Sequence, residues 1–156
     1  METFHIQGKR VILILVKNPT GLNQSLALLT QDGEEKNLFI ALNDNAADGR
    51  DISWIWDADV ETLAGVQDRI GQVICSGLRS GDMAVRMKYA GLNPSKIIIQ
   101  ASLQQGIEQA VVGDGQLSYI LCTYTSLFAS RKILIKMQKK YPTPEPGRAS
   151  MPEGSA

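Results

Sequence analysis

The chain has 156 residues, 44% of them hydrophobic, and its sixteen basic residues balance sixteen acidic ones. This length suits one domain with a substantial core, and the balanced charge argues against a nucleic-acid or polyanion partner. No apolar run approaches the roughly 18 residues of a membrane span, and the N-terminus lacks the charged-then-apolar pattern of a signal peptide.

Strand and helix signals alternate along the chain. The apolar runs predict strands, and the segments between them predict helices. These units predict an α/β fold: a Rossmann-like, mostly parallel sheet of about five to six strands with helices on both faces. We expect strands at 11–16, 38–42, 73–75, 97–99 and 119–122, helices at 22–30, 80–90, 103–112 and 126–140, a short extended piece at 53–56 and a helical turn at 60–63.

The C-terminal segment, residues 141–156, has a different composition from the rest of the chain. It contains several prolines and then glycine, serine and alanine. Such a segment has too little apolar surface to join a core. We therefore expect one domain over residues 1–140, followed by a flexible tail.

The cysteines and the histidine limit the chemistry available to this chain. Cys75 and Cys122 each lie in an apolar run, so buried free thiols in a reducing compartment are expected. His5, the single histidine, precedes the first predicted strand and has no route to the strand ends. A Ser-His or Cys-His pair is therefore not expected there, and no cluster has the spacing of a zinc site.

The segment 43–53 is the strongest candidate for function. It follows the strand at 38–42, and ligands in parallel α/β sheets bind at the carboxyl ends of strands. Polar residues also follow three other strands, at 17–19, 76–79 and 123–126, so four polar segments should meet at one edge. Asn, Asp and Gly also form ordinary turns, which is the alternative interpretation. Three aspartates within 44–51 exceed what a turn requires.

Known ligand motifs give little support for a nucleotide or metal site. No Gly-x-Gly-x-x-Gly follows the first strand and no phosphate loop is present. Residues 77–81 with Arg79 could hold an anion at a helix start, although a plain helix N-terminus explains them as well. Asp44, Asp48 and Asp51 could together bind Mg²⁺ or Ca²⁺, but their spacing differs from that of an EF-hand loop.

Two tryptophans close the polar segment. Trp54 and Trp56 share one face if residues 53–56 are extended. They either cover the core or form an aromatic patch for a protein partner. Further along, the five basic residues within 131–140, with no acid among them, are expected on the solvated face of the last helix, where they favour its C-terminal dipole.

Several segments in order resemble a known family. Residues 17–24, 42–51 and 53–59, then Gly77-Leu78-Arg79 and residues 124–127, are similar to the C-terminal domain of the MurT-type subunit of bacterial lipid II isoglutaminyl synthase, a Mur ligase relative. The resemblance implies a Rossmann-like fold, as in Mur ligase C-terminal domains, and a complex with a class I-type glutamine amidotransferase subunit. The complex would amidate the D-glutamate of the lipid II stem peptide to D-isoglutamine, with ATP and Mg²⁺ activating the carboxylate and glutamine supplying ammonia.

The resemblance also implies roles for individual residues. The partner would contribute a Cys nucleophile and a His, and this domain the acid that orients the His, which matches Asp51. An ionised carboxylate fixes the tautomer of an imidazole and stabilises its protonated form. The residues expected to bind or support substrate are Lys17, Asn18, Asn43, Asp44, Asp48 and Arg79, and those expected at the partner interface are Arg50, Trp54 and Trp56. No metal ligand is expected.

The family's central domain, with its ATP phosphate loop and four-cysteine zinc module, has no counterpart here. The sequence is thus expected to be an excised or stand-alone domain that binds no cofactor and is inactive alone. Its partners would be the glutaminase, the remaining Mur ligase-like domains and lipid II, in the cytoplasm at the inner face of the cell membrane, with no nucleic acid. Two alternatives stay open: a non-catalytic protein-docking module, and a free-standing nucleotide- or metal-binding Rossmann-like domain.

Overall fold

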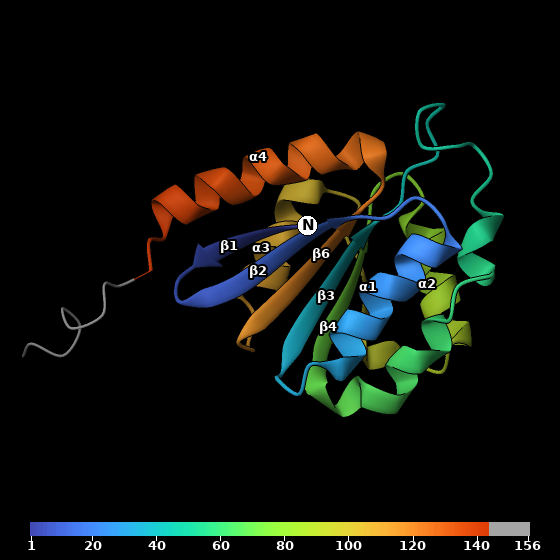
Figure 1. Cartoon of the computed structure of the whole chain (residues 1–156), viewed down its shortest axis with the longest axis horizontal. Helices are drawn as coiled ribbons and strands as arrows, with labels where there is room; N and C mark the ends of the chain where they lie inside the picture. Colours follow the sequence, from blue (N-terminus) through green and yellow to red (C-terminus); the bar gives the residue numbers. More distant parts are fainter. Residues whose placement is uncertain (144–156) are drawn as a thin grey trace, which may run out of the picture.

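A six-stranded sheet forms the centre of the computed structural model, which describes residues 1–143 (Figure 1). The strand order is β1-β2-β6-β3-β4-β5; β1 and β2 are antiparallel, and every other neighbouring pair is parallel. The predicted α/β architecture with a mostly parallel sheet is therefore confirmed, although the sheet is mixed. The strands are β1 (Glu2–Ile6), β2 (Lys9–Leu15), β3 (Lys36–Ala41), β4 (Ile70–Ser76), β5 (Ile97–Ile99) and β6 (Leu117–Cys122).

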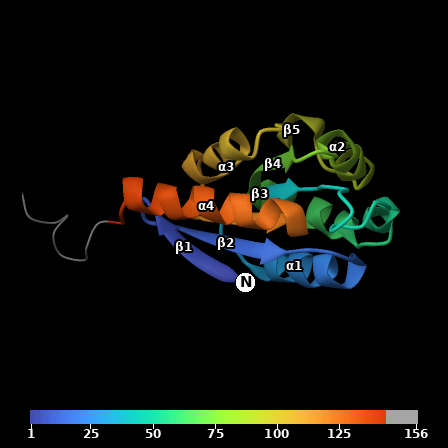
Figure 2. The ribbon, with the colours of Figure 1, turned by 90° about the horizontal axis from the view of Figure 1, so that it is seen from above.

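Helices cover the sheet and divide the core in two. One apolar cluster joins the sheet to α1, α2 and the short helices η1 and η2, and the other joins it to α3 and α4. Figure 2 shows α4 between α3 and the β1–β2 pair. No helix among residues 1–143 is long and apolar enough to cross a membrane. The helices are α1 (Pro19–Gln31), η1 (Ser53–Trp56), η2 (Val60–Arg69), α2 (Ser80–Tyr89), η3 (Pro94–Lys96), α3 (Leu103–Val112) and α4 (Tyr124–Lys140).

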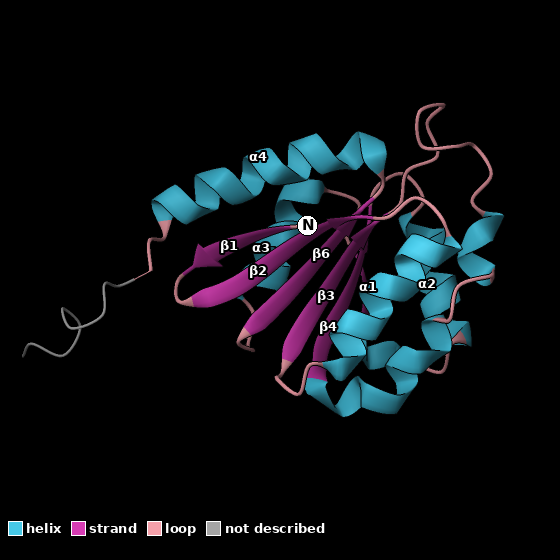
Figure 3. Ribbon diagram, in the orientation of Figure 1, coloured by secondary structure: helices cyan, strands magenta, loops and turns pink. Residues whose placement is uncertain are grey.

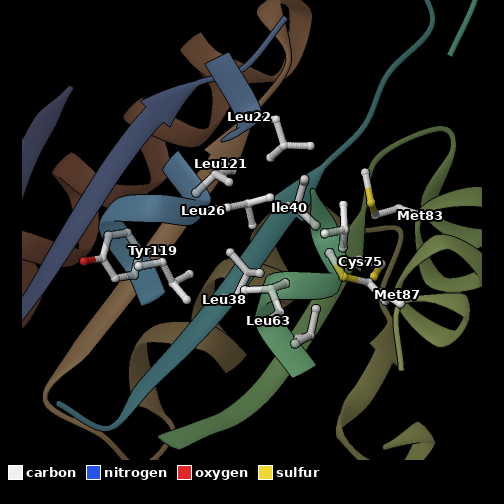
Figure 4. Packing of buried hydrophobic residues seen from close by; sticks show 14 of the residues in the cluster. Leu22, Leu26, Leu38, Ile40, Leu63, Cys75, Met83, Met87, Tyr119 and Leu121 are labelled. Atoms are coloured by element: carbon white, nitrogen blue, oxygen red, sulfur yellow. The ribbon is translucent and has the colours of Figure 1, made fainter. Parts of the chain in front are cut away.

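The central strands are buried on both faces because each carries apolar residues at successive positions. Leu38 and Ile40 of β3 point into the α1 side of the core (Figure 4), whereas Phe39 and Ala41 point into the α3–α4 side. This alternation follows from the two-residue period of a strand. It explains why these runs are continuous in apolar residues rather than alternating with polar ones.

β1 is an element that the sequence analysis did not predict. Phe4 and Ile6 are buried in the α4 side of the core, and the strand turns into β2 through Gln7 and Gly8, both with positive φ, as in tight hairpin turns. His5 on this strand pairs with Arg10 near the amino end of β2. It therefore lies at the end of the sheet away from segment 43–53, as expected.

The segment 53–56 is a 3₁₀ helix, η1, so the prediction of an extended piece was wrong. The helix turns Ile55 into the core, and an aspartate side chain before it, Asp51, accepts the Ser53 N–H, which starts the turn. Trp54 packs partly buried against the core while Trp56 is exposed. The two tryptophans therefore do not share a face. The predicted turn at 60–63 is likewise longer, extending through η2.

The β1–β2 turn contacts the residues directly after the predicted domain boundary at residue 140. The Gln7 N–H donates to the Tyr141 carbonyl over 3.1 Å, and the Gly8 N–H donates to the Thr143 hydroxyl over 3.3 Å. Tyr141 also packs against the α4 side of the core. The rest of the predicted tail, residues 144–156, lies outside the described residues.

Candidate functional site

The loop 42–52 projects from the carboxyl end of β3, between the connections that follow β4 and β6 (Figure 3). Its first residues stay attached to both neighbours: the Leu42 N–H donates to Ser76, and the Asn43 N–H donates to the Thr123 hydroxyl over 2.9 Å. The parallel sheet therefore brings three of the four predicted polar segments into contact, those at 43–53, 76–79 and 123–126. The fourth, 17–19, follows β2, which pairs with β6 and not with β3.

Asn43 braces this edge of the sheet. Its Oδ1 accepts the Leu78 N–H over 2.9 Å, and its Nδ2 donates to the Thr125 hydroxyl over 3.0 Å. Gly77 lies directly beneath, with a φ of +84°, and a Cβ there would be 2.6 Å from Asn43 Oδ1. The amide of Asn43 thus joins three connections. Its predicted role in binding or supporting substrate stays a prediction.

Asp48 folds the loop back onto the start of α4. Its Oδ1 accepts the Thr125 N–H over 2.7 Å, and its Oδ2 accepts the Thr125 hydroxyl over 2.5 Å. Thr123, the residue before α4, makes no side-chain capping bond of its own. Asp48 therefore supplies the acceptor, and a negative charge at a helix N-terminus is stabilising.

Asp51 follows Asp48 by three residues and is exposed to solvent. Its Oδ1 accepts the Ser53 N–H over 2.9 Å. That backbone hydrogen bond, followed by one from the Ser53 side chain, lowers the pKa of the Asp51 carboxyl below its ordinary value. The group is therefore an ionised, accessible carboxylate at neutral pH, directly before η1.

Arg86 of α2 anchors the helical turns that follow Asp51. Its side chain is 2% exposed; Nε donates to the Ile55 carbonyl and Nη2 to the Ala58 carbonyl, each over 2.8 Å. Its Nη1 also lies 2.8 Å from a carboxylate oxygen of Glu61. The central carbon of the guanidinium lies over the Trp56 ring, 5.0 Å from the ring centroid. α2 and η1 are thus fixed to each other.

The remaining predicted residues lie around this centre. Asp44 pairs with Arg79 at 3.5 Å, and Arg79 also lies 2.8 Å from Asp82. Asn18 caps α1 by accepting the Gly21 N–H over 2.8 Å. Lys17 and Arg50 are exposed, and their predicted roles stay predictions.

The possible Mg²⁺ or Ca²⁺ site is not formed. Asp44, Asp48 and Asp51 each have a different partner (Arg79, Thr125 and Ser53, respectively). Within residues 1–143 no group of three or more His, Cys, Asp or Glu side chains is arranged to hold a metal ion.

A shallow pocket of about 440 Å³ lies beside the loop. None of its lining residues carries a charge. Phosphate recognition at a nucleotide site relies on Lys or Arg, or on a cradle of backbone N–H groups in a glycine-rich loop. This pocket has no such side chain, although three of its lining residues (Gly77, Leu78 and Ser80) belong to the helix start that could hold an anion. Its lining residues are Asn43, Asn45, Gly77, Leu78, Ser80, Ala101 and Leu103.

Thr125 and Arg86 are site residues whose roles sequence reasoning missed. Thr125 was recognised only as part of a polar strand end, and nothing in the sequence around Arg86 distinguishes it from a solvated helix residue. The one available signal is its position within a helix that must pack on the sheet, where an unpaired arginine is costly.

The comparison with known proteins identifies the fold family. The sequence matches the family model described as MurT ligase C-terminal over residues 15–127. The chain belongs to the MurT ligase C-terminal family. The resemblance predicted from the sequence motifs is therefore confirmed, and the matched range of this MurT domain contains Asp48, Asp51, Arg86 and Thr125.

Curated relatives carry the same name. The MurT domain is 36% identical over 137 residues to "Lipid II isoglutaminyl synthase (glutamine-hydrolyzing) subunit MurT" of Streptococcus pneumoniae, an alignment that covers 88% of this chain and 30% of the relative. It is 37% identical over 127 residues to the subunits of that name from two strains of Staphylococcus aureus, covering 81% of this chain and 28% of each relative. The chain thus spans less than a third of the length of these relatives.

Proposed function

We propose that this MurT domain is part of a glutamine-hydrolysing lipid II isoglutaminyl synthase, in which it docks a glutaminase subunit and supplies Asp51 to that subunit's Cys-His pair. The observation that carries the proposal is the state of Asp51: an exposed carboxylate with a lowered pKa, on a segment fixed to the fold. The relatives' printed name supports the choice of reaction.

The chain's own residues cannot complete a nucleophilic site around Asp51. Its single histidine, His5, lies at the other end of the sheet. The thiols of Cys75 and Cys122 are free and buried, and burial raises their pKa to about 12 and about 11. The carboxylate therefore has a use in such chemistry only if the imidazole and the thiol come from outside this sequence, and we assign them to the glutaminase subunit.

The chemistry assigned to Asp51 is that of an orienting acid. Its carboxylate accepts the N–H of the partner's imidazole, holds the tautomer whose other nitrogen takes the thiol proton, and stabilises the imidazolium that results. The thiolate then attacks the carbonyl carbon of the glutamine side-chain amide; the C–N bond breaks as the imidazolium returns its proton to the leaving ammonia, and water hydrolyses the resulting thioester to glutamate. The released ammonia would amidate the D-glutamate of lipid II, whose carboxylate is activated by ATP and Mg²⁺ in the remaining Mur ligase-like domains.

The second candidate is a docking module without a catalytic acid. It is favoured by the exposed Trp56 and Tyr89, which are 49% and 74% exposed and adjacent, because exposed aromatic residues are enriched in protein interfaces. No such observation favours the free-standing nucleotide- or metal-binding domain, since its pocket is uncharged and the aspartates do not converge.

The deciding experiment is glutamine hydrolysis by the complete subunit assembled with its glutaminase partner, carrying Asp51→Asn. The change keeps the shape and removes the charge, so we expect a loss on the order of 10²- to 10⁴-fold with complex formation unchanged. Asp57→Asn neutralises another exposed acid of the same segment and should leave the rate unchanged. Activity of Asp51→Asn within about twofold of wild type would contradict the catalytic role and favour the docking module.

A further inference from the structure

The segment that carries Asp51 is held at both ends by side chains from distant elements. On its C-terminal side, Arg86 fixes η1 through the Ile55 carbonyl. On its N-terminal side, Asp48 is fixed to Thr125. Between these points Asp51 itself has only local partners, the N–H and the side chain of Ser53. The direction of its carboxylate therefore depends on the two anchors.

The Thr125 hydroxyl is the centre of the N-terminal anchor. It donates to Asp48 Oδ2 over 2.5 Å and accepts from Asn43 Nδ2 and Asn45 Nδ2, each over 3.0 Å. A hydroxyl has one donor and two acceptor sites, so its capacity is fully used. All three of its partners belong to the loop 42–52, whereas Thr125 belongs to the first turn of α4.

The turn that Thr125 holds is also closed by bonds of its own. Asp48 Oδ2 also accepts the Asn45 N–H over 3.1 Å, and the Asp48 N–H donates to the Asn45 carbonyl over 2.9 Å. The turn 45–48 is thus held together by bonds between its first and last residues, and Asp48 attaches it to α4. Gly49, with a φ of +87°, then leads the backbone outward to Asp51. Without the Thr125 hydroxyl, only the Thr125 N–H still holds Asp48 to α4, and the turn that leads to Asp51 is less firmly placed.

We propose that Thr125 is a positioning residue for glutamine hydrolysis, acting through Asp48 on the placement of Asp51. The inference rests on the proposed function of Asp51. An orienting acid must be held within a fraction of an ångström of its productive position, and a displacement of about 1 Å can cost on the order of 10²-fold in rate. Thr125 does not contact the reacting groups. It acts by fixing the position of the Asp51 carboxylate.

The first test compares Thr125→Val with Thr125→Ser in the complete subunit, assembled with a saturating amount of glutaminase partner. Valine keeps the shape and removes the hydroxyl, and serine retains it. We expect kcat for glutamine hydrolysis to fall roughly 10- to 100-fold in Thr125→Val, with KM unchanged because glutamine binds on the partner, and to recover to within about threefold in Thr125→Ser. Equal rates for Thr125→Val and wild type would overturn the inference while leaving Asp51 unaffected.

The second test separates positioning from a general effect on the fold. If Thr125 acts through Asp51, Thr125→Val should cause no further loss in an Asp51→Asn background. Losses that multiply in the double variant would overturn the inference, although the role of Asp51 would stand. An Asp51→Asn single variant with wild-type activity would instead overturn the proposed function, and the inference with it.

Discussion

Trp56 packs edge to face against Tyr89, with ring centroids 5.8 Å apart and planes inclined by 66°. One ring comes from η1 and the other from the end of α2, and the Arg86 guanidinium lies beneath Trp56. Although both rings are exposed, this packing limits their freedom. A rigid exposed aromatic pair loses little entropy on binding, which suits a docking surface.

Trp56→Ala should weaken association with the glutaminase partner, whereas Trp54→Ala should lower the stability of the domain. Aromatic anchors contribute about 2 kcal/mol or more, so we expect the Kd to rise roughly 30-fold. Trp54 packs against the core, and its removal should cost about 2 kcal/mol of unfolding free energy. Titration calorimetry and urea unfolding measure the two effects. Unchanged affinity in Trp56→Ala would place the partner elsewhere.

Arg86→Met should destabilise the domain far more than Glu61→Gln does. The methionine leaves the buried carbonyls of Ile55 and Ala58 without a donor, and each such loss costs about 1–3 kcal/mol. The Glu61 side chain is 60% exposed, so its pairing contributes about 1 kcal/mol at most. Urea unfolding of the two variants gives the comparison, and similar midpoints would refute the anchoring role of the arginine.

Gly77→Ala should be more disruptive than Gly49→Ala, although both residues have positive φ. At Gly49 a Cβ meets nothing within 4 Å, so the cost is the backbone term of about 1–2 kcal/mol. At Gly77 the Cβ would also lie 2.6 Å from Asn43 Oδ1 and 2.9 Å from the Leu42 carbonyl oxygen. We expect a further loss of about 1–3 kcal/mol as Asn43 is displaced. Equal free energies of unfolding for the two variants would contradict this expectation, because they would mean that the sheet edge around Gly77 accommodates the added Cβ without loss.

The domain should lose stability above pH 9. Burial raises the pKa of the Cys75 thiol to about 12 and of the Cys122 thiol to about 11, and burial with the nearby Asp32 raises that of Tyr119 to about 12. Well below pH 9 these groups are protonated in both states, so their contribution is complete. Above it the unfolded chain releases protons first, and stability falls between about pH 9 and 12.

Urea unfolding at several pH values measures this loss, with a slope of up to about 1.4 kcal/mol per pH unit for each fully buried group. Replacing Cys75 and Cys122 together by alanine should make the decline shallower. Both thiols of the folded wild type should also stay unreactive toward an alkylating reagent at pH 8. Rapid labelling under native conditions would contradict their burial.

Most of the sheet could be predicted because its signal is local. The apolar runs that became β2, β3, β4 and β6 are continuous, so burial on both faces follows from each run alone. The interpretation failed at residues 53–56, where alternating tryptophans suggested a strand. There, a side chain from another element, Arg86, binds the Ile55 carbonyl, and no pattern within the segment reports that bond.

The sequence by itself determined the fold class, the strand end that carries the polar loop, and the identity of the family, because these depend on runs and motifs contiguous in the chain. Only the tertiary structure decided which polar residues brace the loop and which one is free. Asp48 and Thr125 are 77 positions apart, and their contact exists because β3 and β6 are neighbours in the sheet. Strand order is a property of the whole chain, so the contacts that separate the bracing Asp48 from the exposed Asp51 could be seen only once it was known.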